Sequence, residues 1–372
     1  MNISCLQENL SSSLSLVRAG IGKETGLTIL STILIRAEEK FIYLNTTNLE
    51  VAIQCTVRGK VEEEGSIALP AKTFTDFISL LPKEKIELKK IDTTLEITCG
   101  AYHTKIHGMV PDEFPLIPPP EGGSVLTCLQ KDLKGALFSV GHAASQQETR
   151  PELHGVLFQW VQEKNHCVCV GTDAYRLAET FIKARGNTPD VSCIIPLKTV
   201  YELSRTLLSD DDSECEVCIT DTQVSIKTDM VECVSKIVQG AFPDYHSIIP
   251  QHIVTRAVLE RDELNRAVKA TSLFSRGGLH DVVCHLVPTD GTRGTVTLSS
   301  SNASVGENTV TLDAEMTGSE NTITLNYRYL LDGLSHMESD VVSFEVVDTQ
   351  SPCILRPAGK GELTYLIMPI RE

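Results

Sequence analysis

Apolar residues recur along the chain at a spacing that is typical of amphipathic helices. Leu10, Leu14 and Val17 stand at i, i+4 and i+7, which places their side chains on one face of a helix. The same spacing returns at Leu133, Leu137 and Val140 and at Leu264, Val268 and Thr271. A second set of stripes comprises Phe74, Phe77, Ile78 and Leu81, then Val200, Leu203 and Leu207, then Leu330, Leu334 and Met337. The pattern predicts two helices in each third of the chain.

The segments between these helices have the pattern of strands. They alternate polar and apolar residues or run apolar between Gly, Asn and Asp turns. The clearest examples are residues 41–45, 49–57, 86–88, 95–98, 224–227 and 296–312. Two helices packed on antiparallel sheet, repeated three times, predict an α+β fold.

Three sequence anchors repeat in the same order along the chain, which indicates a triplicated unit. The first anchor occupies residues 5–10, 128–133 and 258–264, the second residues 70–77, 196–203 and 326–330, and the third residues 108–112 and 240–244, with a truncated copy at 368–369. One third of the 372 residues is 124, close to the offsets between copies. Because prolines end regular structure, the prolines near residues 118–123 and 250–251 mark the boundaries. The sequence predicts domains at 1–122, 123–251 and 252–372.

Composition narrows the classes of function. The chain carries 49 acidic and 33 basic residues, a formal net charge of −16, which argues against a tail that coats polyanions or a protein of the membrane surface. The proportions of hydrophobic and charged residues, 41% and 22%, are those of a globular protein. No apolar run is long enough to span a bilayer, and residues 1–10 lack the pattern of a secretory signal. We therefore expect a cytoplasmic protein.

Twelve cysteines raise the alternative of a metal site. Cys167, Cys169, Cys215 and Cys218 form the closest groupings, and four thiolates are a typical zinc ligand set. The simpler interpretation is that Cys167 and Cys169 share the buried face of a strand. We expect mostly free thiols, no metal and no cofactor.

Catalytic motifs are absent from the sequence. Thr172, Asp173 and histidines such as His103, His107 and His142 show no spacing typical of a nucleophile, a metal site or a phosphate-binding loop. The sequence therefore predicts a protein that is not an enzyme.

Basic residues recur on the helix faces that point away from the predicted core. Each lies two positions before a core residue of the stripe, or two or five positions after one. The set comprises Lys72, Lys131, Lys198, Arg205, Arg266, Lys269 and Arg328. Three acidic residues lie on or near the same faces, so basic residues are favoured there but are not exclusive: Glu8, Asp76 and Glu202. A net-acidic protein with basic helix faces attracts phosphate to that one surface.

Three segments carry a resemblance to a known family. Residues 171–178 (GTDAYRLA), 242–245 (FPDY) and 365–371 (YLIMPIR) resemble signatures of the bacterial sliding clamps, the beta subunits of DNA polymerase III. The resemblance covers the full chain and its triplication. It implies a head-to-tail homodimeric ring of six similar domains, with helices lining the hole. Such a ring encircles duplex DNA without sequence specificity and is a non-catalytic processivity subunit of the polymerase holoenzyme.

The resemblance also implies residues for each contact. It adds Lys23, Gln147 and Arg150 to the DNA-facing set, and it places Thr104 and Ile106 against Leu273 and Phe274 in the dimer interface. A hydrophobic cleft for short partner peptides would be lined by Leu153, Thr172, Ala174, Tyr175, Arg176, Leu177, Pro243, Ile248, Leu279, Asn326, Tyr329, Leu366, Ile367, Met368, Pro369, Ile370 and Arg371. The implied partners are double-stranded DNA, the polymerase alpha subunit, a separate ATP-driven clamp loader, other polymerases and repair proteins, with no membrane.

Four positions depart from the family pattern. Ala174 replaces the usual glycine and Tyr175 the usual histidine, Ser247 stands where some members have arginine, and Glu372 follows Arg371 where leucine is common. These departures bear on peptide preference. Two other classes of function stay open, an enzyme that uses the clustered thiols and a scaffold protein of repeated β-rich domains.

Overall fold

The computed structural model describes residues 1–22, 27–115, 117–118, 120–210, 212–289, 291–359 and 361–371. The chain divides into two compact units. Unit 1 comprises residues 1–134, 162–165 and 184–237, and unit 2 comprises residues 135–161, 166–183 and 238–372. The division passes through the middle repeat, so it does not test the predicted boundaries after residues 122 and 251.

Unit 1 contains two antiparallel sheets. Its strands are β1 (Asn2–Leu6), β2 (Thr32–Glu38), β3 (Phe41–Thr47), β4 (Val51–Val57), β5 (Gly59–Glu63), β6 (Gly65–Pro70), β7 (Lys85–Ile91), β8 (Thr94–Cys99), β9 (Tyr102–His107), β10 (Ser124–Leu129), β14 (Val191–Pro196), β15 (Glu214–Ile219), β16 (Gln223–Lys227) and β17 (Val231–Lys236). One sheet has the order β5-β1-β7-β8-β9. The other runs β6-β2-β3-β4-β17-β16-β15-β10. The helices α1 (Gln7–Val17), α2 (Ala71–Leu80) and α4 (Leu197–Thr206) pack on these sheets.

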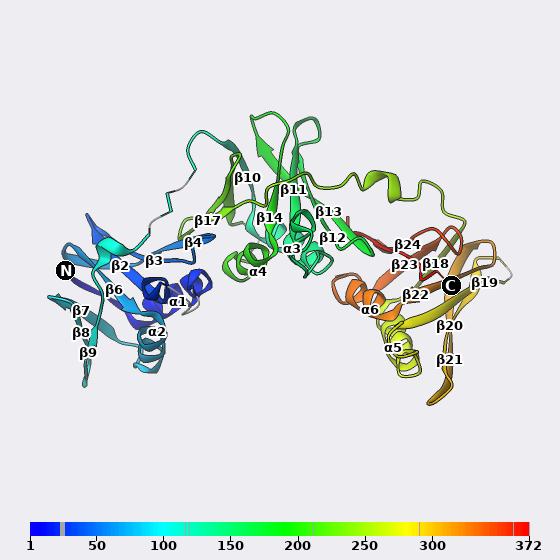
Figure 1. Cartoon of the computed structure of the whole chain (residues 1–372), viewed down its shortest axis with the longest axis horizontal. Coiled ribbons are helices and arrows are strands. Elements are labelled where there is room, and N and C mark those ends of the chain that lie inside the picture. The colour runs from blue at the N-terminus through cyan, green and yellow to red at the C-terminus, as the bar shows by residue number, and fades with distance from the viewer. Residues whose placement is uncertain are drawn as a thin grey trace. The chain divides into compact units, whose positions relative to one another are not determined.

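Unit 2 contains one long antiparallel sheet. Its strands are β11 (Gly155–Val161), β12 (His166–Thr172), most of β13 (Arg176–Gly186), β18 (Thr255–Glu260), β19 (Asp281–Pro288), β20 (Arg293–Asn302), β21 (Gly306–Gly318), β22 (Asn321–Asn326), β23 (Val341–Val346), β24 (Cys353–Pro357) and β25 (Thr364–Ile367). The order is β11-β12-β13-β25-β24-β23-β18-β21-β20-β19-β22. Helices α5 (Arg261–Ser272) and α6 (Tyr327–Ser335) lie side by side (Figure 1), and most of α3 (Gln130–Gly141) belongs to this unit.

The helical stripes form the core faces that their spacing predicts. Leu10, Leu14 and Val17 on α1 are each at most 1% exposed. The matching residues of α3 and α5 are buried too, as are the stripes of α4 and α6. Phe77 of α2 is only partly buried, because it lies at the edge of the stripe formed by Phe74 and Ile78.

Two strand predictions were wrong in their limits. Residues 49–57 were expected to form one strand, but β4 begins at Val51 after a turn in which Leu49 has a left-handed backbone, with φ of +72°. Residues 296–312 divide into β20 and β21, because the chain reverses between Asn302 and Gly306. Within the described ranges, no helix combines the length and hydrophobicity needed to cross a membrane.

Candidate functional site

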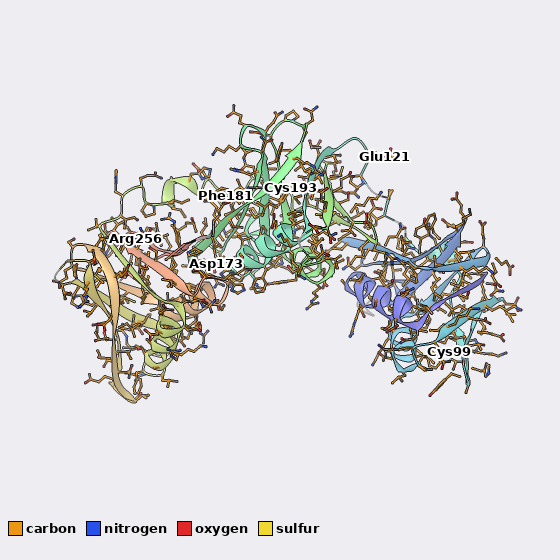
Figure 2. All side chains as sticks on the ribbon, turned by 180° about the vertical axis from the view of Figure 1, so that it is seen from behind. Cys99, Glu121, Asp173, Phe181, Cys193 and Arg256 are labelled. Carbon is orange, nitrogen blue, oxygen red and sulfur yellow. The ribbon has the colours of Figure 1, made fainter. Side chains whose placement is uncertain are left out.

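A tight turn of unit 2, residues 172–176, forms the centre of the predicted cleft. The Thr172 hydroxyl donates to the carbonyl oxygen of Arg176 at 2.6 Å and accepts the Ala174 N–H at 3.1 Å. Asp173 (labelled in Figure 2) accepts the N–H groups of Tyr175 and Arg176 through Oδ1, at 2.9 and 3.0 Å. Ala174 has a φ of +74°, which lies in the left-handed region that favours glycine. The turn leaves the Tyr175 side chain 64% exposed.

The C-terminal segment lies along this turn. β25 pairs with β13, so that Ile367 is opposite Arg176 and Leu366 is opposite Leu177. Beyond β25, the N–H of Met368 donates to the carbonyl oxygen of Tyr175 at 2.9 Å. The N–H of Ile370 donates to the carbonyl oxygen of Thr324 at 2.8 Å. Residues 368–370 are thus held at the surface by backbone hydrogen bonds after the strand has ended.

Arg176 joins the turn to α6. Its Nε donates to Asp173 Oδ2 at 3.1 Å, and its Nη1 donates to Asp332 Oδ2. The guanidinium carbon lies 4.7 Å from the centre of the Tyr329 ring, within the range of a cation–π contact. The Tyr365 hydroxyl donates to the carbonyl oxygen of Tyr329 at 2.9 Å. The polar part of the site is therefore fixed before any ligand arrives.

The apolar residues of the predicted cleft fall into a buried base and an accessible rim. Leu153, Leu177, Leu366 and Ile367 are at most 3% exposed. The accessible residues are Tyr175, Pro243, Ile248 and Leu279, with Met368, Pro369 and Ile370 partly buried and Arg371 exposed. Asn326 caps α6, because its side-chain oxygen accepts the N–H of Arg328 at 2.9 Å. Backbone hydrogen bonds hold residues 368–370 against Tyr175 and Thr324, and accessible apolar side chains on a fixed backbone suit an extended peptide.

Most of the predicted DNA-facing residues are accessible. Lys72, Lys198, Arg205, Arg266, Lys269 and Arg328 are exposed on helices, and Gln147 and Arg150 are exposed in the loop after α3. Lys131 is partly buried. Three arginines have acidic neighbours, Arg205 with Glu202 at 3.4 Å, Arg266 with Glu263 at 4.0 Å and Arg150 with Glu152 at 3.7 Å. Lys23 lies outside the described residues.

The four predicted dimer-interface residues occupy different environments. Thr104 and Ile106 lie on β9, which is an edge strand of its five-stranded sheet. Ile106 is only 6% exposed, so its side chain packs inside the chain and its backbone is the part left at the edge. Leu273, which follows α5, is 73% exposed, and Phe274 beside it is half-buried.

The thiols that suggested a metal site are core residues. All twelve cysteines are buried as free thiols, and burial raises the pKa of the Cys167 thiol to about 12. Such a shift disfavours the thiolate that zinc requires. In the part of the chain that the structure describes, no group of three His, Cys, Asp or Glu side chains could hold a metal ion.

Sequence reasoning missed one cluster beside the site. His142 on α3 stacks on His336, with ring centres 3.8 Å apart and an angle of 7° between the planes. The centre of the Tyr365 ring lies 5.3 Å from the centre of the His142 ring. The two histidines are far apart in the sequence and share no motif, so no local signal could have paired them.

Models of one family match the chain in three successive parts. Residues 1–118 match the N-terminal domain of the DNA polymerase III beta subunit, residues 127–244 its central domain and residues 246–371 its C-terminal domain. The Beta sliding clamp of Staphylococcus aureus is 30% identical over 362 residues, covering 94% of each chain. That of Staphylococcus epidermidis is 29% identical with the same coverage.

Solved structures of the same family share the fold. The DNA polymerase III beta subunit of Thermotoga maritima matches with a TM-score of 0.91 and 26% identity, covering 100% of this chain and 99% of that one. The beta subunit of Pseudomonas aeruginosa matches with a TM-score of 0.92 and 25% identity, covering 100% of both chains. The protein thus has three tandem clamp domains of helices on antiparallel sheets and acts in DNA replication, and the chain belongs to the DNA polymerase III beta subunit family, the bacterial sliding clamps.

Proposed function

We propose that this sliding clamp is a non-catalytic homodimeric ring that tethers the replicative polymerase to duplex DNA through the cleft around Tyr175. The observation that carries the proposal is the pairing of the 172–176 turn with the C-terminal segment, which holds Met368 beside the exposed Tyr175. The partners would be the polymerase alpha subunit, the clamp loader, other polymerases and repair proteins. Each would insert a short peptide with apolar anchors.

The ring would form head to tail from two chains. Three clamp domains make half of a six-domain ring, so two chains would complete it. The β9 edge, in the part of the chain that matches the N-terminal clamp domain, presents unpaired backbone groups, and Leu273, in the part that matches the C-terminal domain, presents an exposed apolar side chain. Edge strands and exposed apolar side chains are features that a partner subunit covers. The domain boundaries after residues 122 and 251 and the cytoplasmic location belong to the same proposal.

Contact with DNA would be electrostatic and independent of sequence. Exposed lysines and arginines on helices neutralise phosphates, which carry no sequence information. Retention would then depend on topological linkage, with weak contacts that salt screens.

Loading onto circular DNA tests this proposal. With the cognate loader, the clamp should stay on nicked circular DNA through a salt wash and leave when the circle is cut. Replacing Lys72, Lys198 and Lys269 by glutamine should reduce loading and lower the slope of log affinity against log salt by about 0.9 for each phosphate that is no longer neutralised.

A matched variant controls for net charge. Lys40, Lys164 and Lys227 are also exposed but lie outside the α-helices, so their replacement by glutamine should leave loading unchanged. Retention that survives cutting of the circle would rule out the ring, and equal losses in both triple variants would show that the helix faces are only solvated.

A further inference from the structure

The turn that carries the cleft in unit 2 is built a second time in unit 1. There the Thr47 hydroxyl donates to the carbonyl oxygen of Val51 at 3.0 Å and accepts the N–H of Leu49 at 3.1 Å. Asn48 Oδ1 accepts the N–H groups of Glu50 and Val51 at 3.0 and 2.9 Å. The φ of Leu49 is +72°, against +74° for Ala174. Residues 47–51 therefore correspond to residues 172–176.

The neighbouring strand is also reproduced. β17 pairs with β4 in unit 1 as β25 pairs with β13 in unit 2. The N–H of Lys236 donates to the carbonyl oxygen of Glu50 at 2.9 Å, just as the N–H of Met368 donates to that of Tyr175. We call these arrangements the first junction (β4, β17 and their turn) and the second junction (β13, β25 and their turn). By this register, Asn45 corresponds to Val170, Ala52 to Leu177 and Val234 to Leu366.

The corresponding side chains differ in size and polarity. In the second junction, Val170, Leu177 and Leu366 belong to one hydrophobic cluster with Tyr245, which is 5% exposed. In the first junction, the smaller Ala52 and Val234 and the polar Asn45 stand at those positions. A pocket of about 410 Å³ lies beside them, within the range of small ligand sites.

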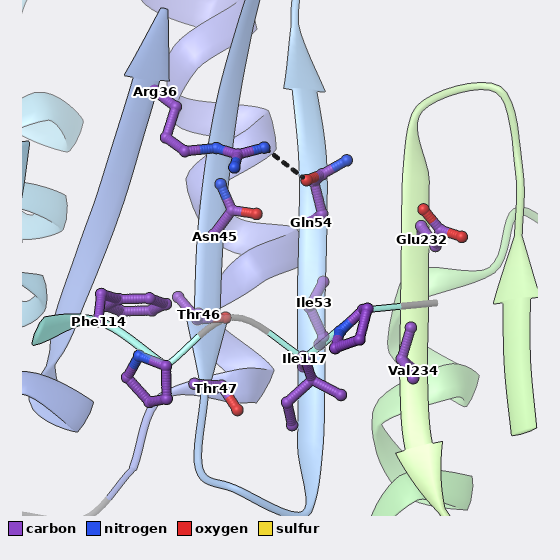
Figure 3. Close-up of a pocket in the computed structure, with 13 residues that line it drawn as sticks. Arg36, Asn45, Thr46, Thr47, Ile53, Gln54, Phe114, Ile117, Glu232 and Val234 are labelled. Carbon is purple, nitrogen blue, oxygen red and sulfur yellow. Dashed lines mark hydrogen bonds between the residues drawn. The ribbon is translucent and has the colours of Figure 1, made fainter. Parts of the chain in front are cut away.

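The pocket has a polar end and an apolar end, as Figure 3 shows. Arg36, Asn45 and Gln54 lie together at one end, and Phe114 and Ile117 lie at the other. On the wall contributed by β17, Val234 lies toward the apolar end and Glu232 lies level with Gln54 at the polar end. A ligand that fits must therefore combine an apolar group with a polar one.

The polar end has hydrogen-bond donors to spare. Asn45 is only 6% exposed, yet its Nδ2 has no hydrogen-bond partner among the described residues, and the same holds for Arg36 Nε. Arg36 Nη2 reaches Gln54 Oε1 only at 3.5 Å, and Arg36 Nε lies 3.6 Å from the Glu38 carboxylate. A buried donor without a hydrogen-bond partner lowers stability, so an acceptor that binds here would form hydrogen bonds with two donors that otherwise lack them. Arginine is best matched by a carboxylate.

We propose that this pocket binds the carboxyl-terminal aromatic residue of a peptide. The ring would lie between Phe114 and Val234, and the terminal carboxylate would accept from Arg36 and Asn45. Tyr245 supplies the internal precedent, because it places an aromatic ring in the corresponding cluster of the second junction. The site is separate from the Tyr175 cleft, so its failure would leave the proposed clamp function unaffected.

Methyl NMR of the full-length protein with N-acetyl-phenylalanine tests the site. The expected result is a shift of the Ile53, Ile117 and Val234 methyl signals, with affinity at least tenfold weaker for N-acetyl-phenylalanine amide, which lacks the carboxylate. Equal affinity of the acid and the amide would overturn the proposal. Shifts confined to Leu177 and Leu366 of the second junction would overturn it as well.

Two variants copy the second junction into the first. Ala52→Leu fills the pocket and Asn45→Val removes the spare donor, so each should weaken binding of the acid at least tenfold. Asn45→Val should also raise the melting temperature of the free protein, because it removes an unpaired buried amide. A lower melting temperature would show that Asn45 has a structural role and would overturn the proposal. If either variant does not fold, Arg36→Gln, at the more exposed end of the pocket, repeats the binding test. Undiminished binding of the acid to Arg36→Gln would also overturn the proposal.

Discussion

His142 is a buried base in the aromatic cluster beside the cleft. Burial lowers the pKa of its imidazole to about 2, and the nearby His336 and Arg176 add to this effect. The ring is therefore neutral in the folded protein. In the unfolded chain its pKa returns to 6.5, so the unfolded state binds one more proton below that pH.

Because of this residue, the free energy of unfolding should decrease as the pH is lowered. The contribution of His142 is complete above pH 6.5 and is lost as the pH decreases, by about 1 kcal/mol between pH 7 and 5.5. Denaturant unfolding of the wild type and His142→Phe at both pH values measures the difference, which should be smaller in the variant. His252, which is exposed, provides the control, and His252→Phe should behave like the wild type. An unchanged pH dependence in His142→Phe would mean that the imidazole is charged in the fold.

At the scale of elements, the C-terminal strand and the residues after it have separate roles. β25 is an inner strand, paired on one side with β13 and on the other with β24. Residues 368–371 lie beyond it and add the backbone hydrogen bonds of Met368 and Ile370. Their removal leaves the ladder of β25 complete.

Deletion of residues 368–372 should therefore separate folding from binding. The truncated protein should melt within a few degrees of the wild type, since each of the two missing hydrogen bonds contributes about 1 kcal/mol. It should no longer bind a peptide of the Gln-Leu-x-Leu-Phe type, because the rim formed by Met368, Pro369 and Ile370 is gone. Calorimetry and peptide titration on one sample check both. Unchanged peptide affinity in a folded protein would contradict the assignment of the cleft.

Sequence periodicity predicted those elements that depend on local spacing. The stripes of α1 and α5 were recognisable because burial follows the turn of the helix. The limits of β4 could not be recognised from the sequence, because Leu49 adopts a left-handed backbone that Thr47 and Asn48 stabilise through side-chain hydrogen bonds. The pairing of β13 with β25 and the stacking of His142 on His336 depend on tertiary structure, and only the resemblance to clamps indicated that residues 172–177 and 366–371 share a site.

At the scale of the whole molecule, the proposed ring depends on one contact made twice. Leu273 and Phe274 would meet the β9 edge of the second chain, and burial of apolar side chains would hold the contact. A charge placed in such an interface is costly because it must be desolvated.

Replacing Leu273 and Phe274 together by glutamate should therefore yield monomers. Light scattering should give the chain mass of 40.7 kDa in place of twice that value. Leu80 and Leu208 are also exposed, at 78% and 51%, and their double replacement by glutamate should leave the mass of the dimer unchanged. A Leu273/Phe274 variant that stays dimeric would place the interface elsewhere.

The burial of all twelve thiols has a practical consequence for fluorescent labelling of the protein. Thiol reagents attack the thiolate, and burial raises the pKa of Cys5, Cys233 and Cys284 to about 12. The folded chain should therefore react with maleimide dyes only when it opens. A single cysteine introduced at an exposed position, such as Lys164, would then take up a fluorophore selectively, with all native cysteines left in place.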